Sequence, residues 1–241
     1  MISATGVRLR LGNRDILDIP EFSLHPGHVT ALVGPNGSGK SSLLLTLALL
    51  QPPSQGSIRF SGEAVNPSNQ LGFRRRLAVV FQEPLLLDAT VRGNLMTALR
   101  IRGIPRREAQ QRTSYWLERF GVLQLARQPA RTLSGGEAQR TSLARAFALE
   151  PEVLFMDEPF ASLDYPTRTL LLKEMGMILR ELHTTTLFVT HDYSEIPFLA
   201  QQVAVLYEGR IIRYGSIADV FGNASLERLT WVPWQRALED V

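Results

Sequence analysis

Short runs of apolar and β-branched residues recur along the chain, and each leads directly into a glycine or a polar residue. Four of these runs are Val29 to Val33, Leu77 to Phe81, Val153 to Met156, and Thr186 to Val189. Uninterrupted apolar runs of about four to eight residues are typical of strands that are buried on both faces, as in parallel sheets. The sequence therefore predicts a mainly parallel sheet at the centre of the fold.

The residues that follow these four runs predict a binding site. They are, in chain order, Gly34, Gln82, Asp157 and His191. Ligands of open α/β sheets bind in the crevice outside the carboxyl ends of the strands. Because parallel strands end at the same edge of a sheet, we expect these four residues to contribute to one site.

Helical and antiparallel patterns accompany the predicted strands. Apolar residues with the spacing of one helix face separate the strands, so the order of elements is α/β; one such face is formed by Leu171, Met175, Ile178 and Leu182. Alternation at Val7, Leu9 and Leu11 before a Gly12-Asn13 turn, with Ser57 to Phe60 later, predicts a small antiparallel subdomain. A further strand at Val203 to Tyr207, followed by Glu208-Gly209 and Arg210 to Tyr214, predicts a closing hairpin.

The segment 83–131 has helical stretches that are broken at Gly103, Pro105 and Gly121, and it has no strong strand. We therefore expect an inserted α-helical subdomain there. Its nine Arg and four acidic residues give a local net charge of +5. Proximity to an anionic membrane surface would suit that charge, but a solvated helix face is the simpler interpretation.

The composition is that of a globular chain, with 44% hydrophobic and 20% charged residues among 241. We expect a single domain over 1–241, with 222–241 as a C-terminal tail in which Trp231 and Trp234 pack against the body. The longest aliphatic stretch, Leu43 to Leu50, is shorter than the about 18 to 20 apolar residues of a membrane helix. The N-terminus carries charges where a signal peptide is apolar, so we expect the cytosol.

Charge and cysteine content exclude some classes of site. The chain has no cysteine, which excludes disulfides, thiolate zinc sites and cysteine nucleophiles. The formal net charge of +3 would suit a nucleic-acid partner, yet the basic residues are scattered apart from Arg74 to Arg76. A solvated basic surface is the better interpretation, and we expect no nucleic-acid partner.

A complete P-loop lies between the first predicted strand and a predicted helix. Its residues are Gly34, Pro35, Asn36, Gly37, Ser38, Gly39, Lys40 and Ser41, and we count Ser42 with the nucleotide-binding residues. The glycines let backbone N–H groups turn around phosphate oxygens, and the helix N-terminus adds partial positive charge. Lys40 supplies a charge for the β- and γ-phosphates, and the Ser41 hydroxyl is placed to bind Mg²⁺. A glycine-rich turn without a ligand is the alternative, which the strand–loop–helix context disfavours.

Two adjacent carboxylates, Asp157 and Glu158, follow the run Val153 to Met156 as in a Walker B motif. Such acids are costly to bury at a strand end unless a cation or a proton transfer occupies them. We expect Asp157 to hold Mg²⁺, directly or through water, and Glu158 to accept a proton from attacking water. A chance pair of surface acids is the alternative, and the apolar run before it argues against that.

The pentapeptide Leu133-Ser134-Gly135-Gly136-Glu137 opens the helical pattern Ala138 to Leu149. It predicts a second helix N-terminus that binds an anion, although Ser134 as a simple N-cap would fit any helix. Together with the P-loop and the Walker B motif, this segment resembles the signature of the ABC (ATP-binding cassette) transporter ATPases. The resemblance covers essentially the whole chain, with the motifs in the family's order.

The resemblance implies a dimer in which each of two ATP molecules lies between two subunits. Ser134, Gly135 and Gly136 of one subunit would then face the γ-phosphate that is bound by the other. Gln82 matches the Q-loop, which senses Mg²⁺ and water and links the core to the helical subdomain. Asp164, in Ser162-Leu163-Asp164, matches the D-loop at the dimer interface. His191 matches the switch histidine that contacts the γ-phosphate, and we group it with Glu158 and Gln82 as catalytic.

Leu11 departs from the family pattern, which usually has an aromatic residue there that stacks on adenine. Base stacking is worth about 1 to 3 kcal/mol in single-stranded nucleic-acid sites, and leucine offers no π-face. We therefore expect weaker base discrimination and some tolerance of GTP.

The resemblance implies that ATP favours the closed dimer and that hydrolysis returns it to the open form. Separate integral membrane permease subunits would carry the motion, with an extracytoplasmic substrate-binding protein, so the chain would lie peripherally on the cytoplasmic face of the membrane. The stretches Leu47 to Gly56 and Val80 to Leu87, and the lack of an added C-terminal regulatory domain, are similar to ATPases of oxyanion importers, particularly for tungstate. Amino acids, phosphate, metal complexes and split-subunit export stay open.

Several other functions are weighed against this one. An ABC-type ATPase acting on DNA or the ribosome would carry a coiled-coil insertion or a second cassette, which 241 residues do not accommodate. A small-molecule P-loop kinase has no use for Leu133 to Glu137, and a GTPase needs an Asn-Lys-x-Asp, which is absent. A binding module without turnover would lack Glu158 or His191. The sequence therefore favours an ATPase.

Overall fold

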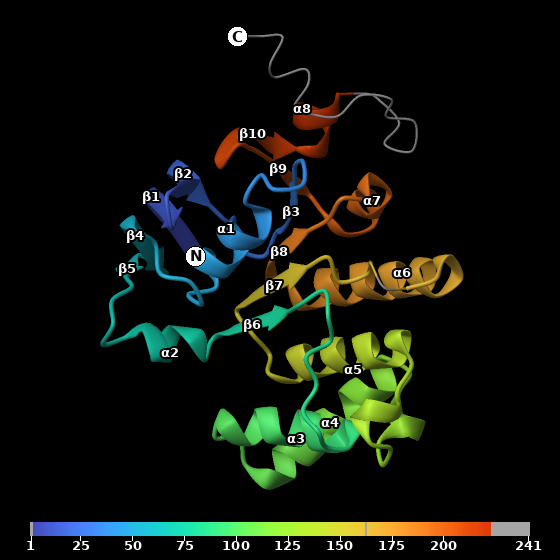
Figure 1. The fold of residues 1–241 in the computed structure, drawn as a ribbon. Helices are drawn as coiled ribbons and strands as arrows, with labels where there is room; N and C mark the ends of the chain where they lie inside the picture. The colour runs from blue at the N-terminus through green and yellow to red at the C-terminus, as the bar shows by residue number, and fades with distance from the viewer. Residues whose placement is uncertain (1, 162, 223–241) are drawn as a thin grey trace.

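The computed structural model describes residues 2–161 and 163–222. The expected packing of Trp231 and Trp234, like all of the predicted tail beyond Gly222, lies outside the described residues. Figure 1 shows a central sheet with a smaller second sheet beside it and a group of helices near one of its edges. In the described part of the chain, no helix is both long and apolar enough to cross a membrane.

The central sheet has six strands in the order β10-β9-β3-β8-β7-β6. The strands are β3 (Val29–Val33), β6 (Leu77–Val80), β7 (Val153–Asp157), β8 (Thr185–Val189), β9 (Gln202–Tyr207) and β10 (Arg210–Ser216). All neighbouring pairs are parallel except β9 with β10, which form the predicted hairpin. The predicted α/β fold with a mainly parallel sheet is confirmed.

The second sheet is antiparallel, with the order β2-β1-β4-β5. Its strands are β1 (Ile2–Leu11), β2 (Arg14–Ser23), β4 (Gln55–Phe60) and β5 (Glu63–Ala64). Val7 and Leu9 point into the core, as their alternation predicts, because one face of the sheet covers α1 (Lys40–Leu47) and the central sheet. Leu11 is half exposed because it ends the strand at the turn.

Helices α3 (Val91–Ile101), α4 (Arg106–Arg119) and α5 (Gly135–Ala148) gather next to the β6 edge of the central sheet (Figure 1). The segment 83–131 contains α3 and α4, with Gly103 and Pro105 in the turn between them. The remaining helices are α2 (Gln70–Arg74), α6 (Tyr165–Leu182), α7 (Ile196–Leu199) and α8 (Ile217–Phe221), with short 3₁₀ turns at Leu123–Leu125, Ala130–Thr132 and Tyr193–Glu195. The boundaries 83–131 of the inserted subdomain stay a prediction.

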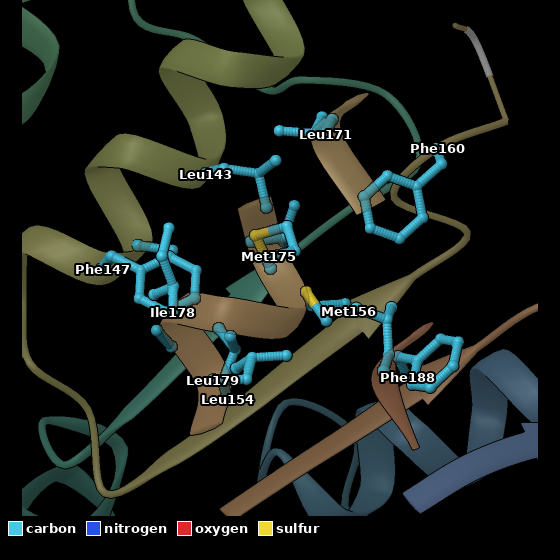
Figure 2. Close-up of a cluster of buried hydrophobic side chains, with 14 of the residues drawn as sticks. Leu143, Phe147, Leu154, Met156, Phe160, Leu171, Met175, Ile178, Leu179 and Phe188 are labelled. Atoms are coloured by element: carbon cyan, nitrogen blue, oxygen red, sulfur yellow. The ribbon is translucent and has the colours of Figure 1, made fainter. Parts of the chain in front are cut away.

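Helices α5 and α6 join the helical end to the sheet through one apolar cluster. Figure 2 shows their side chains pointing toward those of β7 and β8; the labelled residues of the cluster are Leu143, Phe147, Leu154, Met156, Phe160, Leu171, Met175, Ile178, Leu179 and Phe188. The apolar face predicted for α6 is wrong at one position. Leu182 is exposed because it is the last residue of the helix, and Leu179 is buried instead.

Candidate functional site

Sheet order brings the carboxyl ends of β3, β8 and β7 together, although they are far apart in the chain. Asp157 pairs with Val189 in the β7–β8 ladder, and the Glu158 N–H donates to the Val189 carbonyl at 3.0 Å. The Thr190 N–H donates to the Leu32 carbonyl at 3.3 Å. The two carboxylates therefore lie beside the segment that leads to His191, and both lie at the end of the sheet where the P-loop begins.

The P-loop has a conformation that only glycine allows at its first position. A Cβ on Gly34 would lie 2.0 Å from the carbonyl oxygen of Leu206 in β9. Gly39, the residue before α1, has a φ of 101° and its Cβ would meet the Ile16 carbonyl oxygen at 3.0 Å. The loop is therefore pressed between β9 and the start of β2, which holds its backbone in place.

Two polar side chains of the P-loop are buried. The Lys40 ammonium donates to the carbonyl oxygens of Gly34 and Pro35 at 2.9 and 3.0 Å. The Ser38 hydroxyl is buried and has no hydrogen-bond partner among the described residues. Leaving a buried hydroxyl unpaired costs about 1 to 3 kcal/mol, so a phosphate oxygen that accepts this bond would stabilise the loop. The residues present thus fit a nucleotide phosphate.

The charges of Lys40, Asp157 and Glu158 influence one another, and Ser41 is hydrogen-bonded to Asp157. Burial lowers the pKa of the Lys40 ammonium, and the charges of Glu158 and Asp157 oppose that shift. Burial raises the pKa of the Asp157 carboxyl, which accepts a hydrogen bond from the Ser41 side chain that acts in the opposite direction. A partly buried carboxylate beside a hydroxyl is a donor set that suits Mg²⁺, so these residues also fit the expected cation.

Glu158 and His191 are in direct contact. The His191 Nδ1 lies 3.1 Å from the Glu158 Oε2, and the Glu158 side chain is 18% exposed whereas that of His191 is 59% exposed. Glu158 has a φ of 45°, which is uncommon for a residue other than glycine. Its N–H is bound to Val189 and its carbonyl accepts from the Ala161 N–H. A backbone at such a φ is strained, and the Glu158 carboxylate that it carries meets the His191 imidazole.

The signature segment begins α5 with a capping box. The Ser134 N–H and hydroxyl both donate to the Glu137 carboxylate, at 2.8 and 2.7 Å, and the Glu137 N–H donates back to the Ser134 hydroxyl at 3.4 Å. These bonds hold the pKa of Glu137 below its ordinary value. Gly135 and Gly136 form the first turn. Among the described residues, no hydrogen bond or ion pair joins this segment to the P-loop.

Asp164, Gln82 and Leu11 all lie at exposed positions. Asp164 is the N-cap of α6 and accepts from the N–H and hydroxyl of Thr167 at 3.0 and 2.9 Å. Gln82 follows β6, the outermost parallel strand, and its side chain makes no hydrogen bond to the described residues. Ser162, which precedes Leu163 in the matched D-loop, lies outside the described residues.

A family model described as "ABC transporter" matches residues 17–161, which is more than half of the chain. The chain belongs to the ABC transporter family. The P-loop, the Asp157-Glu158 pair and the signature segment all fall within the matched range, whereas His191 lies beyond it.

Curated ABC-family relatives carry the names of import ATP-binding proteins. The sulfate/thiosulfate import ATP-binding protein CysA of Mycobacterium bovis is 40% identical over 213 residues, covering 88% of this chain and 60% of the relative. The Fe(3+) ions import ATP-binding protein FbpC of Streptomyces coelicolor is 37% identical, covering 92% and 63%. The molybdate/tungstate import ATP-binding protein WtpC of Thermococcus kodakarensis is 36% identical, covering 86% and 63%. The chain thus spans about three fifths of the length of these relatives.

Solved structures of ABC-family proteins share the fold. CbiO1 from Clostridium perfringens, described as part of the ABC transporter complex cbiONQ, superposes with a TM-score of 0.84 at 28% identity and covers 100% of this chain and 98% of its own. The ATP-binding cassette MJ0796, in a dimeric structure bound to ADP and Pi, superposes with a TM-score of 0.81 at 24% identity, covering 90% of this chain and 99% of its own.

The sequence reasoning about this ABC-family site missed residues outside its motifs. The Ile16 carbonyl borders Gly39, and nothing in the local pattern of β2 indicates that contact. It also missed the partly buried Arg168 and the buried Glu195, which form an ion pair next to the His191 loop. The sequence does place the acidic Glu195 beside the apolar start of a helix at Ile196. Its partner Arg168, however, lies 27 residues earlier, so the local pattern does not indicate the ion pair.

Proposed function

We propose that this ABC-family chain binds ATP with Mg²⁺ at the P-loop and hydrolyses it as the ATP-binding subunit of a transporter. The observation that carries the proposal is the meeting of Lys40, Ser41 and Asp157 with the Glu158–His191 pair at one end of the sheet. A nucleotide-binding module without turnover needs the first three residues but has no need of a partly buried carboxylate in contact with a histidine.

The P-loop residues Gly34 to Ser42 would bind the phosphates through backbone N–H groups, with Lys40 exchanging its carbonyl partners for β- and γ-phosphate oxygens. Ser41, Asp157 and Gln82 would hold Mg²⁺, which when bound neutralises charge on the β- and γ-phosphates. Leu11, exposed at the end of β1, would cover the base by apolar contact.

Glu158 is the proposed general base. It would take a proton from water while the water oxygen bonds to the γ-phosphorus, and the bond from that phosphorus to the β–γ bridging oxygen breaks to release ADP. The His191 imidazole, 3.1 Å from the Glu158 carboxylate, would hold that carboxylate in place and reach the γ-phosphate from its exposed side. The partial burial of Glu158 limits competing hydration of its charge.

A homodimer would complete the site. Ser134 caps α5, Gly135 and Gly136 begin it, and none of the three makes a hydrogen bond to its own P-loop among the described residues; Asp164 is exposed at the start of α6. A helix N-terminus with exposed N–H groups favours an anion, and a second subunit is the proposed source of that anion, its bound ATP. This arrangement explains why a single chain has two segments suited to phosphate.

The finer proposal concerns the transported solute and the partners. The relatives named above carry the names of import ATP-binding proteins for sulfate or thiosulfate, Fe(3+), and molybdate or tungstate, which favours import of an inorganic ion. We propose an oxyanion, with tungstate as one candidate, and separate permease subunits with an extracytoplasmic substrate-binding protein as partners at the cytoplasmic face of the membrane. Uptake assays of the reconstituted complex with tungstate, molybdate, sulfate and Fe³⁺ would decide among these, and transport of none of them would refute the import proposal.

The deciding experiment for hydrolysis compares the chain with Glu158→Gln, measuring phosphate release and sedimentation in ATP and Mg²⁺. Glu118→Gln, an exposed acid on α4, is the matched control. We expect the Glu158 variant to lose turnover and to form an ATP-stabilised dimer, whereas the control behaves like the original chain. Normal turnover in the Glu158 variant would exclude Glu158 as the base, and absence of ATP binding in the original chain would refute the proposed function.

A further inference from the structure

An ion pair between the partly buried Arg168 and the buried Glu195 lies next to the His191 loop and has no role in the mechanism proposed above. The Glu195 side chain is only 3% exposed. Its Oε1 accepts from the Arg168 Nε and Nη2 at 2.9 and 2.7 Å, and its Oε2 accepts from the Thr190 hydroxyl at 2.6 Å. A carboxylate that is buried to this degree is costly unless its oxygens are paired. Both oxygens are paired here, which favours one fixed arrangement.

The same guanidinium also binds the residue on the other side of His191. The Arg168 Nη2 donates to the Asp192 Oδ2, and the Asp192 Oδ1 accepts from the Ser194 N–H at 2.8 Å. The Asp192 N–H donates to the Thr190 hydroxyl at 3.0 Å. Both neighbours of His191 are therefore held by Arg168, one directly and the other through Glu195.

Arg168 lies in the first turn of α6 (Tyr165–Leu182). Its own N–H donates to the carbonyl of the N-cap residue Asp164 at 2.9 Å. The network thus fastens the loop 190–195 to a helix that is packed into the main apolar cluster. The imidazole itself is 59% exposed, so packing does not hold its ring opposite Glu158. Its position depends on the backbone at Thr190 and Asp192.

We propose that Arg168 is a positioning residue that holds the loop 190–195 on α6 so that the His191 imidazole meets the Glu158 carboxylate. A guanidinium suits this role because its planar fork reaches two carboxylates at once, whereas an ammonium is a single point charge. The structural part of the proposal concerns only the His191–Glu158 contact, and its catalytic consequence rests on the proposed hydrolysis of ATP.

The consequence for hydrolysis is a loss in kcat with little change in KM for ATP. The P-loop makes no hydrogen bond or ion pair to Arg168, Asp192 or Glu195 within the described residues, so nucleotide binding is left intact. Displacement of a catalytic group by about 1 Å lowers rates by up to about a hundredfold, and the exposed ring keeps part of its reach. We therefore expect a fall of about tenfold in kcat.

The experiment records the imidazole signals of the chain labelled in its four histidines, at one fixed pH and without nucleotide. His191→Ala assigns the His191 signal, and Glu158→Ala gives its position when the contact is lost. The test variants are the double variant Arg168→Gln with Glu195→Gln, which leaves no unpaired buried charge, and Asp192→Asn, which keeps the Oδ1 acceptor for Ser194. Arg119→Gln is the control. Arg119 lies on α4 and forms an ion pair with Glu181, which is at the opposite end of α6 from Arg168.

We expect the His191 signal of the double variant to move to the position seen in Glu158→Ala. In Asp192→Asn the His191 signal should move part of the way, and in Arg119→Gln it should not move. An unmoved signal in the folded double variant overturns the proposal; if that variant does not fold, an unmoved signal in Asp192→Asn overturns it. If the original chain does not hydrolyse ATP, the proposed function fails while the histidine signals still decide the positioning role.

Discussion

Gly34→Ala tests whether the P-loop is held by its contact with β9. The new Cβ would lie 2.0 Å from the Leu206 carbonyl oxygen, which is backbone and has no freedom to rotate away. Backbone strain at a φ of 156° contributes about 1 to 3 kcal/mol, and forcing an extra carbon into a packed site contributes about 1 to 3 kcal/mol more. We therefore expect a loss of about 2 to 6 kcal/mol in the free energy of unfolding.

Gly37→Ala is the matched control for this prediction. Gly37 also has a positive φ, 80°, but apart from its own chain neighbours no heavy atom of the described residues lies within 4 Å of its Cβ position. Only backbone strain of about 1 to 2 kcal/mol is expected there. Chemical denaturation without nucleotide measures both free energies of unfolding. Equal destabilisation by the two substitutions would refute the view that β9 presses on the loop, because the steric part would then be absent.

Two further predictions concern the edges of the site. Leu11 has no π-face, so ATP and GTP hydrolysis should differ by less than about tenfold in kcat/KM, and Leu11→Tyr should raise the preference for ATP; a larger difference in the original chain would contradict this. Ser134 holds the pKa of Glu137 below its ordinary value of 4.5, so the stabilisation from ionised Glu137 is present above that pH and is lost as the pH falls through the lowered pKa. The original chain should unfold at a higher temperature than Glu137→Gln at pH 7, and the difference between the two unfolding temperatures should narrow at acidic pH. A difference that does not depend on pH would contradict the ionic origin of this stabilisation.

The sequence alone determined the features that depend on local backbone and burial. Buried strands read as apolar runs, so β3, β7 and β8 were predicted to within one residue at each end, and the P-loop carries its conformation in its own glycines. The family, the order of motifs and the mainly parallel sheet followed from these. The positions where a motif follows a strand were predictable for the same reason, since a parallel strand leads to the edge where ligands bind.

Only the tertiary structure decided which of these residues meet. The sheet order β3-β8-β7 differs from the order in the chain, and the pairing of β7 with β8 places His191 against Glu158, 33 positions earlier in the sequence. The pairing of Arg168 with Glu195 and Asp192 likewise depends on how α6 packs beside β8. Leu182 is exposed although its spacing matched the buried face, because the helix ends there. Long-range contacts of this kind depend on sheet order and helix packing, which no local pattern of residues encodes.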